Sequence, residues 1–125
     1  MSQVQADLLY TKEHEWAKVS GNTATIGITD YAQHELGDIV FVDLPQVGKV
    51  VKQGDSFGEI EAVKTVAALY APLSGKIVEV NSALAEAADG INKDPYGNGW
   101  IVKIELSNAS ETSGLLNADA YKGLI

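Results

Sequence analysis

The amino-acid sequence predicts a mainly β domain in which short antiparallel strands form a sandwich or a barrel. From Pro45 onward, turn signals recur about every eight to twelve residues, a spacing typical of such folds. The segments between them are short and rich in β-branched residues, and residues 23–28 alternate polar and apolar side chains. No heptad pattern or solenoid-like repeat is sustained along the chain.

Strands are expected first near the N-terminus, before residue 30. The turn residues Ser20, Gly21 and Asn22 separate two strand-like segments, which is a hairpin signal. The three strands expected here are residues 8–11, 15–19 and 23–28.

A single short helix is expected next, near residues 30–36. Asp30, with Gln33 three residues later, resembles the capping box that begins a helix. Gly37 is typical of the residue that ends one. The helix should therefore have about two turns.

The remainder of the chain predicts further strands and a few helical turns. Between residues 82 and 99 we expect one helical turn followed by an irregular loop. Ser110 and Asn117 are possible N-caps, so two short helices should close the chain. The strands expected are residues 38–44, 48–51, 56–61, 66–71, 76–80 and 100–106.

Length and composition indicate one folded domain over residues 1–125. The hydrophobic content of 46% and the charged content of 21% are close to globular averages. The chain has a net charge of -8, and all nine of its basic residues are lysines. An acidic chain without the forked guanidinium of arginine is a poor match for nucleic acid and a better one for basic patches on proteins. We expect a monomer.

The compartment expected from the sequence is the bacterial cytoplasm. No apolar run approaches the ~20 residues that a spanning helix requires, so no membrane association is expected. The N-terminal segment lacks the features of a signal or transit peptide. An organelle matrix would fit only if a transit peptide had been removed.

The chemistry-bearing residues do not form a recognisable catalytic constellation. There is no cysteine, and neither nucleotide-binding glycine motif is present. His14 lies between Glu13 and Glu15, but on a strand the two carboxylates would point away from the imidazole, so a surface histidine is the favoured interpretation. Glu59 and Glu61 are best explained as a solvated strand face. We therefore expect a protein that is not an enzyme.

Lys64 is the residue that stands out. It lies between two short strand segments, so the chain must reverse direction there and place the lysine at a hairpin tip. The turn contains no Gly, Asn or Pro, the usual turn-forming residues. Turn propensity alone therefore does not explain the residues of this tip.

Several motifs resemble the H protein of the glycine cleavage system, in the same order and over residues of roughly 8 to 125. They are "YTKEHEW", "ATIGITDYAQHELGDIVFVDLP", "IEAVK", "LYAPLSGKIVEVN" and "INKDPYGNGWIVKIELS". The resemblance implies a barrel-sandwich hybrid of two small antiparallel sheets, with short helices at the edge and the C-terminus. It also implies a lipoyl-bearing carrier that shuttles the aminomethyl group of glycine from the decarboxylase to the aminomethyltransferase.

The same resemblance implies roles for individual residues. Lys64 corresponds to the lysine that carries lipoic acid in amide linkage, and Glu61 and Val63 belong to the motif around it that a modifying enzyme would read. Glu15 is a candidate contact in a cleft that shields the arm, although a solvated strand residue is an equal alternative. The implied partners are glycine decarboxylase, a pyridoxal-phosphate enzyme, an aminomethyltransferase, dihydrolipoyl dehydrogenase, and a lipoyl ligase or transferase.

The chain departs from the family pattern beside the lysine. Many members have Ser before Val-Lys, where this chain has an alanine, and small polar or acidic residues often follow the lysine. The positions concerned are Ala62, Thr65, Val66, Ala67 and Ala68. A paralogous lipoyl carrier, a biotinyl carrier, an unmodified β interaction module and a small hydrolase using His14 and Glu15 remain alternatives at this point.

Overall fold

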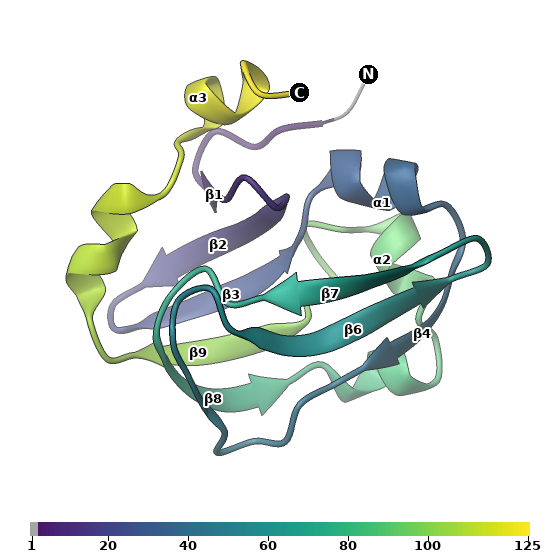
Figure 1. Ribbon diagram of the computed structural model, residues 1–125, viewed down its shortest axis with the longest axis horizontal. Coiled ribbons are helices and arrows are strands. Elements are labelled where there is room, and N and C mark those ends of the chain that lie inside the picture. Colours follow the sequence, from purple (N-terminus) through teal and green to yellow (C-terminus); the bar gives the residue numbers. More distant parts are fainter. Residues whose placement is uncertain (1–2) are drawn as a thin grey trace.

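The structure, a computed structural model, describes residues 3–125 and consists of two antiparallel sheets that face each other (Figure 1). The larger sheet has the strand order β1-β2-β3-β9-β8-β5, and the smaller has the order β4-β6-β7. The larger sheet comprises β1 (Leu9–Tyr10), β2 (Glu15–Ser20), β3 (Thr23–Ile28), β9 (Val102–Leu106), β8 (Gly75–Val80) and β5 (Val50–Val51). The smaller comprises β4 (Ile39–Asp43), β6 (Ser56–Ala62) and β7 (Val66–Tyr70). The expected strands and the hairpin of β2 and β3 are confirmed.

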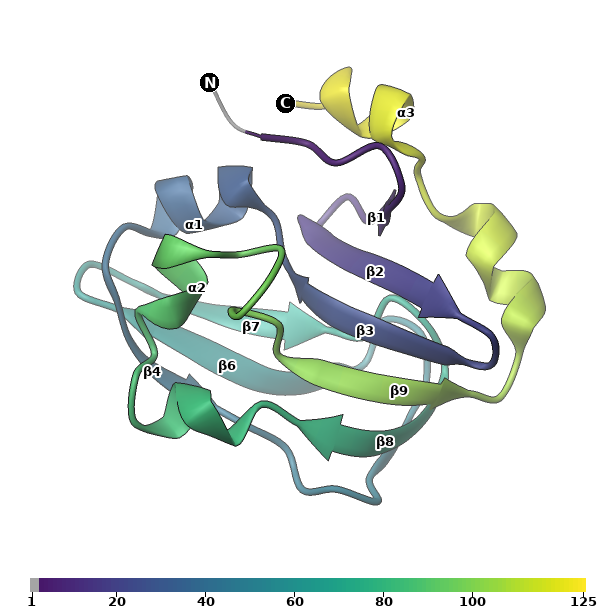
Figure 2. The same ribbon diagram turned by 180° about the vertical axis from the view of Figure 1, so that it is seen from behind.

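Short helices lie at the ends and edges of the two sheets, as Figure 2 shows from behind. Among residues 3–125, none of the helices has the length and apolar character that crossing a bilayer requires. In the described part of the chain, three helices are α-helical and two are 3-10 helices. They are α1 (Asp30–Leu36), η1 (Ser82–Ala85), α2 (Gly90–Lys93), η2 (Ala109–Gly114) and α3 (Ala118–Lys122).

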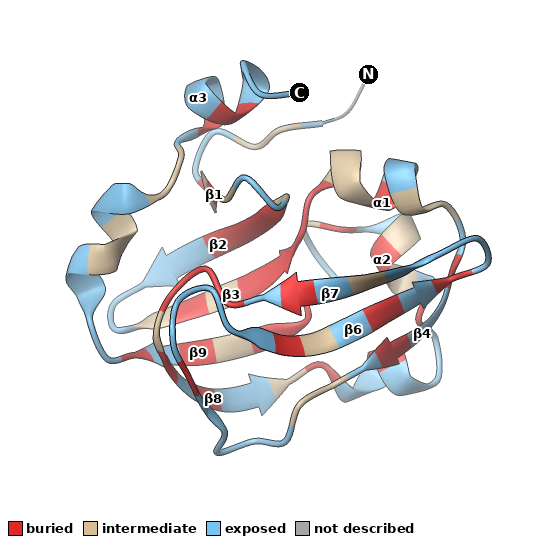
Figure 3. Cartoon of the chain, in the orientation of Figure 1, coloured by how far each residue is buried: buried red, intermediate tan, exposed pale blue. Residues whose placement is uncertain are grey.

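The main core fills the space between the two sheets (Figure 3). Because alternate residues of a strand face opposite sides, each sheet places one row of aliphatic side chains in this space. Ile26 and Ile104 of the larger sheet and Ile60 and Leu69 of the smaller one are at most 2% exposed. Burying each of these side chains contributes roughly 1.5–3 kcal/mol. The core therefore fixes the smaller sheet, which contains Lys64's hairpin, against the larger one.

A second, aromatic cluster holds α3 on the outer face of the larger sheet. The rings of Tyr10 and Tyr121 stack with their centroids 4.6 Å apart, and Trp16 donates a hydrogen bond to the Pro95 carbonyl at 3.0 Å. The indole lies directly over Gly27, where a Cβ atom would come within 2.6 Å of it. A glycine is required at that position because only its bare backbone admits the ring. The C-terminal helix is thus part of the packed structure.

The start of α1 differs from the sequence prediction by one residue. Thr29, not Asp30, is the N-cap: its backbone is extended, and its side chain accepts a hydrogen bond from the Ala32 amide at 3.2 Å. Asp30 is the first helical residue and instead accepts from the Gln33 side chain at 2.8 Å. Gly37 ends the helix as predicted, with φ = 78°, a conformation that favours glycine.

Two predictions for the C-terminal part need correction. The segment 82–99 contains α2 in addition to the expected single turn, η1. Asn117 caps α3 as predicted, but η2 begins after Asn108 rather than at Ser110. The Asn108 side chain accepts hydrogen bonds from both the amide and the hydroxyl of Ser110, so Ser110 lies inside the turn that it was expected to begin.

Candidate functional site

The hairpin of β6 and β7 projects past the edge of the sandwich and carries Lys64 at its tip (Figure 1). The Ala62 amide donates to the Thr65 carbonyl at 2.8 Å and closes the turn. The Val63 amide donates to the Asp38 carbonyl at 3.0 Å, which ties the tip to the segment after α1. This tertiary hydrogen bond explains how the chain reverses without Gly, Asn or Pro. The turn is therefore closed across the lysine and is tied to the rest of the domain by the residue before it.

The Lys64 side chain is exposed and lies over Gly37. A Cβ atom on Gly37 would be 3.2 Å from the Lys64 Cε and 3.6 Å from its Nζ. The ion pairs among residues 3–125 use other cations, His34, Lys93 and Lys103. The Lys64 amine is accordingly accessible to a modifying enzyme and does not have to break an ion pair with the described residues.

The surface around the tip combines apolar and acidic side chains. Val63, next to the lysine, is 72% exposed, and Val66 is 56% exposed. Glu61 is exposed on the outer face of the smaller sheet, between Phe41 and Val66 on the neighbouring strands. The structure thus brings Glu61, Val63 and Lys64 together on one accessible surface.

A cleft of about 290 Å³ lies between the start of β2, helix α1 and strand β7. Its apolar lining includes Ile28, Ile60 and Leu69 from the main core, together with Ala67 and Ala68 of β7. We call this space the arm cleft. Ala68 is four residues from Lys64 along the strand, on the order of 13 Å at the usual rise per residue. A chain attached to the lysine amine and running back along β7 would reach it.

Glu15 is the buried carboxyl group of the arm cleft. It is 2% exposed, so the alternative that it is a solvated strand residue is wrong. Its Oε1 accepts from the Thr11 hydroxyl at 2.7 Å, and its Oε2 accepts from the Tyr70 amide over a longer 3.4 Å. Burial raises the pKa of Glu15 from its ordinary 4.5 to about 7, although both hydrogen bonds oppose the rise.

His14 also lines the arm cleft, although a surface histidine was expected. It is not on a strand: it precedes β2 in a left-handed conformation with φ = 71°. Its Nδ1 is 2.8 Å from the Tyr121 hydroxyl, and its ring lies 4.8 Å from that of Tyr31. Sequence analysis missed this role because the partners come from α1 and α3, more than fifteen and one hundred residues away.

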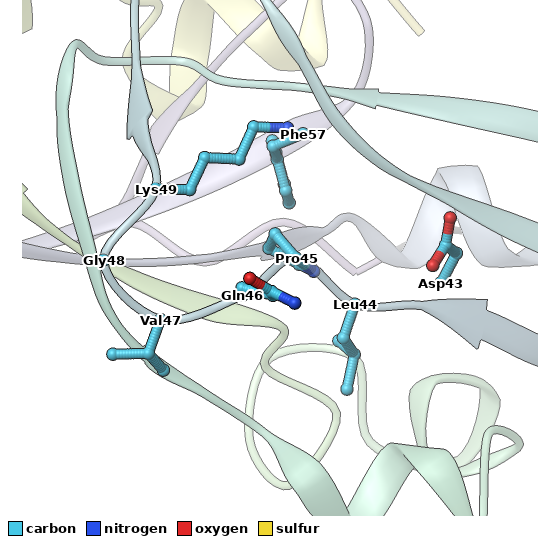
Figure 4. A pocket seen from close by; sticks show the side chains of 8 residues that line it. All are labelled: Asp43, Leu44, Pro45, Gln46, Val47, Gly48, Lys49 and Phe57. Atoms are coloured by element: carbon cyan, nitrogen blue, oxygen red, sulfur yellow. The ribbon is translucent and has the colours of Figure 1, made fainter.

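A larger cavity, of about 590 Å³, follows the end of β4 (Figure 4). Leu44, Pro45 and Gln46 line it from the chain between β4 and β5, and Phe57 closes it on the side of the smaller sheet. The opposite end of β4, at Ile39, is the one that pairs with the hairpin near Lys64. This cavity therefore belongs to the other end of the sheet.

Comparisons with known proteins give one consistent result. The family model described as "Glycine cleavage H-protein" matches residues 8–125. The chain is 57% identical to the glycine cleavage system H protein of Staphylococcus haemolyticus over 122 residues, covering 98% of this chain and 97% of that protein. It is also 57% identical to the corresponding protein of Symbiobacterium thermophilum over 121 residues, covering 97% and 94%. The crystal structure of a glycine cleavage system H protein from Mycobacterium marinum superposes with a TM-score of 0.88 at 42% identity, covering 96% of this chain and 97% of that one.

Proposed function

Because the chain belongs to the glycine cleavage H-protein family, we propose that Lys64 is the residue at which it carries lipoic acid. Members of this family are carriers, not enzymes, and the chain is a lipoyl carrier of the glycine cleavage system. It shuttles the aminomethyl group of glycine from the decarboxylase to the aminomethyltransferase. The barrel-sandwich hybrid expected from the resemblance is confirmed. We propose that residues 1–125 form one lipoyl-carrier domain.

The observation that supports Lys64 most strongly is its position on an anchored tip. An acylated lysine needs an amine that another enzyme can reach, and the Lys64 side chain is exposed. A carrier also needs its attachment point fixed, because a rigid base and a long arm together give a high effective concentration at each partner's active site. The hydrogen bond from Val63 to Asp38 supplies that rigidity. The residues present therefore fit a lysine-linked arm.

The lipoyl group, when bound, supplies a disulfide and dithiol pair that accepts the one-carbon unit and is later reoxidised. The partners that we propose for this chain are glycine decarboxylase, which contains pyridoxal phosphate, an aminomethyltransferase, dihydrolipoyl dehydrogenase, and a lipoyl ligase or transferase. A net charge of -8 favours docking on basic surfaces of those proteins. We propose the bacterial cytoplasm as the compartment, because the compared relatives are bacterial.

Glu61 and Val63 are the residues that we propose the modifying enzyme reads. Both are exposed beside Lys64, and they offer one carboxylate and one apolar contact. Ala62, the first departure from the family pattern, is only 8% exposed and is therefore not available for direct contact. Thr65 and Val66 are exposed and remain within reach of a docked enzyme.

Glu15 is proposed as the polar contact of the arm in the arm cleft. Ala67 and Ala68, the other two departures, line this cleft and make it less polar. Glu15 is the carboxyl group most deeply buried there, since Glu13 and Glu35 are less buried. An apolar cleft with a single buried carboxylate can exclude water from a bound cation and pair with it.

Reconstitution with the three partner enzymes tests this proposal. Lys64→Arg should abolish glycine cleavage while changing the free energy of unfolding by no more than about 0.5 kcal/mol, because the side chain is exposed. Lys76→Arg, an exposed position on β8, is the matched control and should remain fully active. Activity of the Lys64→Arg protein equal to that of the control would show that the attachment residue lies elsewhere.

A further inference from the structure

A chain of hydrogen bonds beside the arm cleft joins α1, α3 and the segment before β2. The Ala32 amide donates to the Thr29 hydroxyl oxygen at 3.2 Å, and that hydroxyl lies 2.7 Å from the Tyr121 hydroxyl. The Tyr121 hydroxyl lies 2.8 Å from the His14 Nδ1. Thr29 and Tyr121 are 0% exposed. The chain therefore runs from the start of α1, through α3, to an imidazole on the wall of the cleft.

The direction of these hydrogen bonds follows from the burial of Thr29. Among residues 3–125, Tyr121 is the one acceptor found for the Thr29 hydroxyl proton, and both side chains are closed to bulk solvent at 0% exposure. If Thr29 donates to Tyr121, the Tyr121 proton is left to donate to the His14 Nδ1. The reverse direction would leave the Thr29 proton without a partner, at a cost of about 1–3 kcal/mol. Neutral His14 must then carry its proton on Nε2.

His14 is also held by its backbone and its neighbours. Its amide donates to the Thr11 carbonyl at 3.2 Å, and its carbonyl accepts from the Thr29 amide at 3.0 Å. The Tyr121 ring meets the imidazole edge to face, with centroids 5.7 Å apart. Among residues 3–125, no hydrogen-bond partner is found for Nε2. The imidazole is therefore fixed in orientation while one ring nitrogen remains available.

We propose that Tyr121 is a positioning residue: it holds His14 as an Nε2–H donor to the sulfur atoms of the arm, in the arm cleft that the Glu15 carboxyl group also lines. This inference rests on the proposed use of the cleft. It gives the C-terminal helix α3 a role at the site, although α3 does not line the cleft itself. The cleft then offers one donor and one acceptor in an otherwise apolar lining.

Burial, and not the charges around it, favours a neutral His14 imidazole at working pH. Glu13 faces it from its own segment, Tyr31 and Glu35 from α1, and Tyr121 from α3, while Glu15 lines the same cleft. Burial lowers the pKa of His14 below its usual 6.5, and the carboxylates of Glu13 and Glu35 only partly oppose this. As pH rises through about 7, His14 is already neutral and Glu15 loses its proton. When the arm carries the aminomethyl group as a cation, its retention in the cleft should therefore strengthen as pH rises through about 7.

Nuclear magnetic resonance of the unmodified protein tests the hydrogen-bond direction. Long-range ¹H–¹⁵N spectra should show His14 as the Nε2–H tautomer at pH 8. Tyr121→Phe removes the donor to Nδ1 and should shift the ring nitrogens toward a mixture of tautomers. Tyr10→Phe, in the stacked partner ring, removes a hydroxyl that bonds Gln5 and should leave His14 unchanged. An Nδ1–H tautomer in the unsubstituted protein would overturn the inference.

Alkylation of the thiols of the reduced lipoyl arm tests whether His14 holds the arm in the cleft. In lipoylated protein, Tyr121→Phe should raise the rate of thiol alkylation several-fold, and Tyr10→Phe should not. His14→Phe keeps an aromatic ring but has no N–H donor, so it should raise the alkylation rate by a similar factor. This second variant keeps the test decisive if Tyr121→Phe fails to fold. Equal rates in all four proteins would overturn the inference. Absence of any lipoyl group would instead contradict the proposed function, and the tautomer measurement would still stand.

Discussion

Glu15 and Lys64 are both ionisable residues, but they have opposite surroundings. Lys64 is exposed at a hairpin tip, whereas Glu15 is buried between the start of β2 and the edge of β7. A buried carboxyl group without a cationic partner favours its neutral form. The two residues therefore have complementary proposed roles, since Lys64 presents the arm and Glu15 provides a polar contact within the arm's reach.

Glu15→Gln should stabilise the protein at alkaline pH. Because the folded-state pKa of Glu15 is raised from 4.5 to about 7, the native state binds one more proton than the unfolded state between these values. The contribution of Glu15 to the free energy of unfolding is therefore fully present below pH 4.5. This contribution, about 3 kcal/mol, is lost as pH rises through 7. The glutamine variant should lack this loss, and its side-chain oxygen can still accept one of the two hydrogen bonds. Urea unfolding at pH 5 and pH 8 measures the difference.

Glu59→Gln is the control for this prediction, because Glu59 is exposed on β6 and is not among the groups whose charge raises the pKa of Glu15. It should leave the difference in unfolding free energy between pH 5 and pH 8 unchanged. A Glu15→Gln protein whose stability falls with pH as steeply as that of the unsubstituted protein would mean that folding does not raise the pKa of Glu15.

The individual elements show where local sequence signals suffice. Strand patterns, the stop at Gly37 and the cap at Asn117 were predicted because each depends on the conformation of a few neighbouring residues. The N-caps of α1 and η2 lie one and two residues before the predicted positions. There, the side chains of Thr29 and Asn108 accept the capping hydrogen bonds. The turn at Lys64 was placed correctly, but its cause, the hydrogen bond to Asp38, is a tertiary contact.

Substitution of the two predicted C-terminal caps separates the correct prediction from the wrong one. Asn117→Ala should lower the free energy of unfolding by about 1 kcal/mol, since its side chain accepts from the Ala120 amide at the start of α3. Ser110→Ala should change it by less than about 0.5 kcal/mol, since Ser110 is exposed and does not cap the turn. Chemical denaturation compares them, and equal losses would contradict the cap assignment.

At the scale of the whole molecule, the fold and a cleft containing Glu15 were expected from the motifs, but the other residues that form the arm cleft could not be predicted. Two sheets and a lysine tip follow from strand spacing and from a resemblance over nearly the whole chain. The cleft is assembled from β2, α1 and β7, and its hydrogen-bond chain is completed by α3. No local sequence pattern predicts that these four segments contact one another. The roles of His14 and Tyr121 at the cleft could therefore be assigned only from the structure.

The overall charge fits a protein that docks on several enzymes in turn. Seventeen acidic residues against nine lysines give a net charge of -8, and the carboxylate of Glu61 is exposed on the same surface as Lys64. Such a surface speeds encounter with basic partners without requiring tight binding. A carrier that must leave each partner after transfer gains from this arrangement.

The central claim, that Lys64 carries the lipoyl group, is tested most directly by intact mass and peptide mapping. The protein would be produced together with a lipoyl ligase and lipoate. The account predicts the added mass of one lipoyl amide, located on the peptide that contains Lys64, and no addition to Lys64→Arg. No added mass, a biotinyl group, or a lipoyl group on any of the other eight lysines would contradict it.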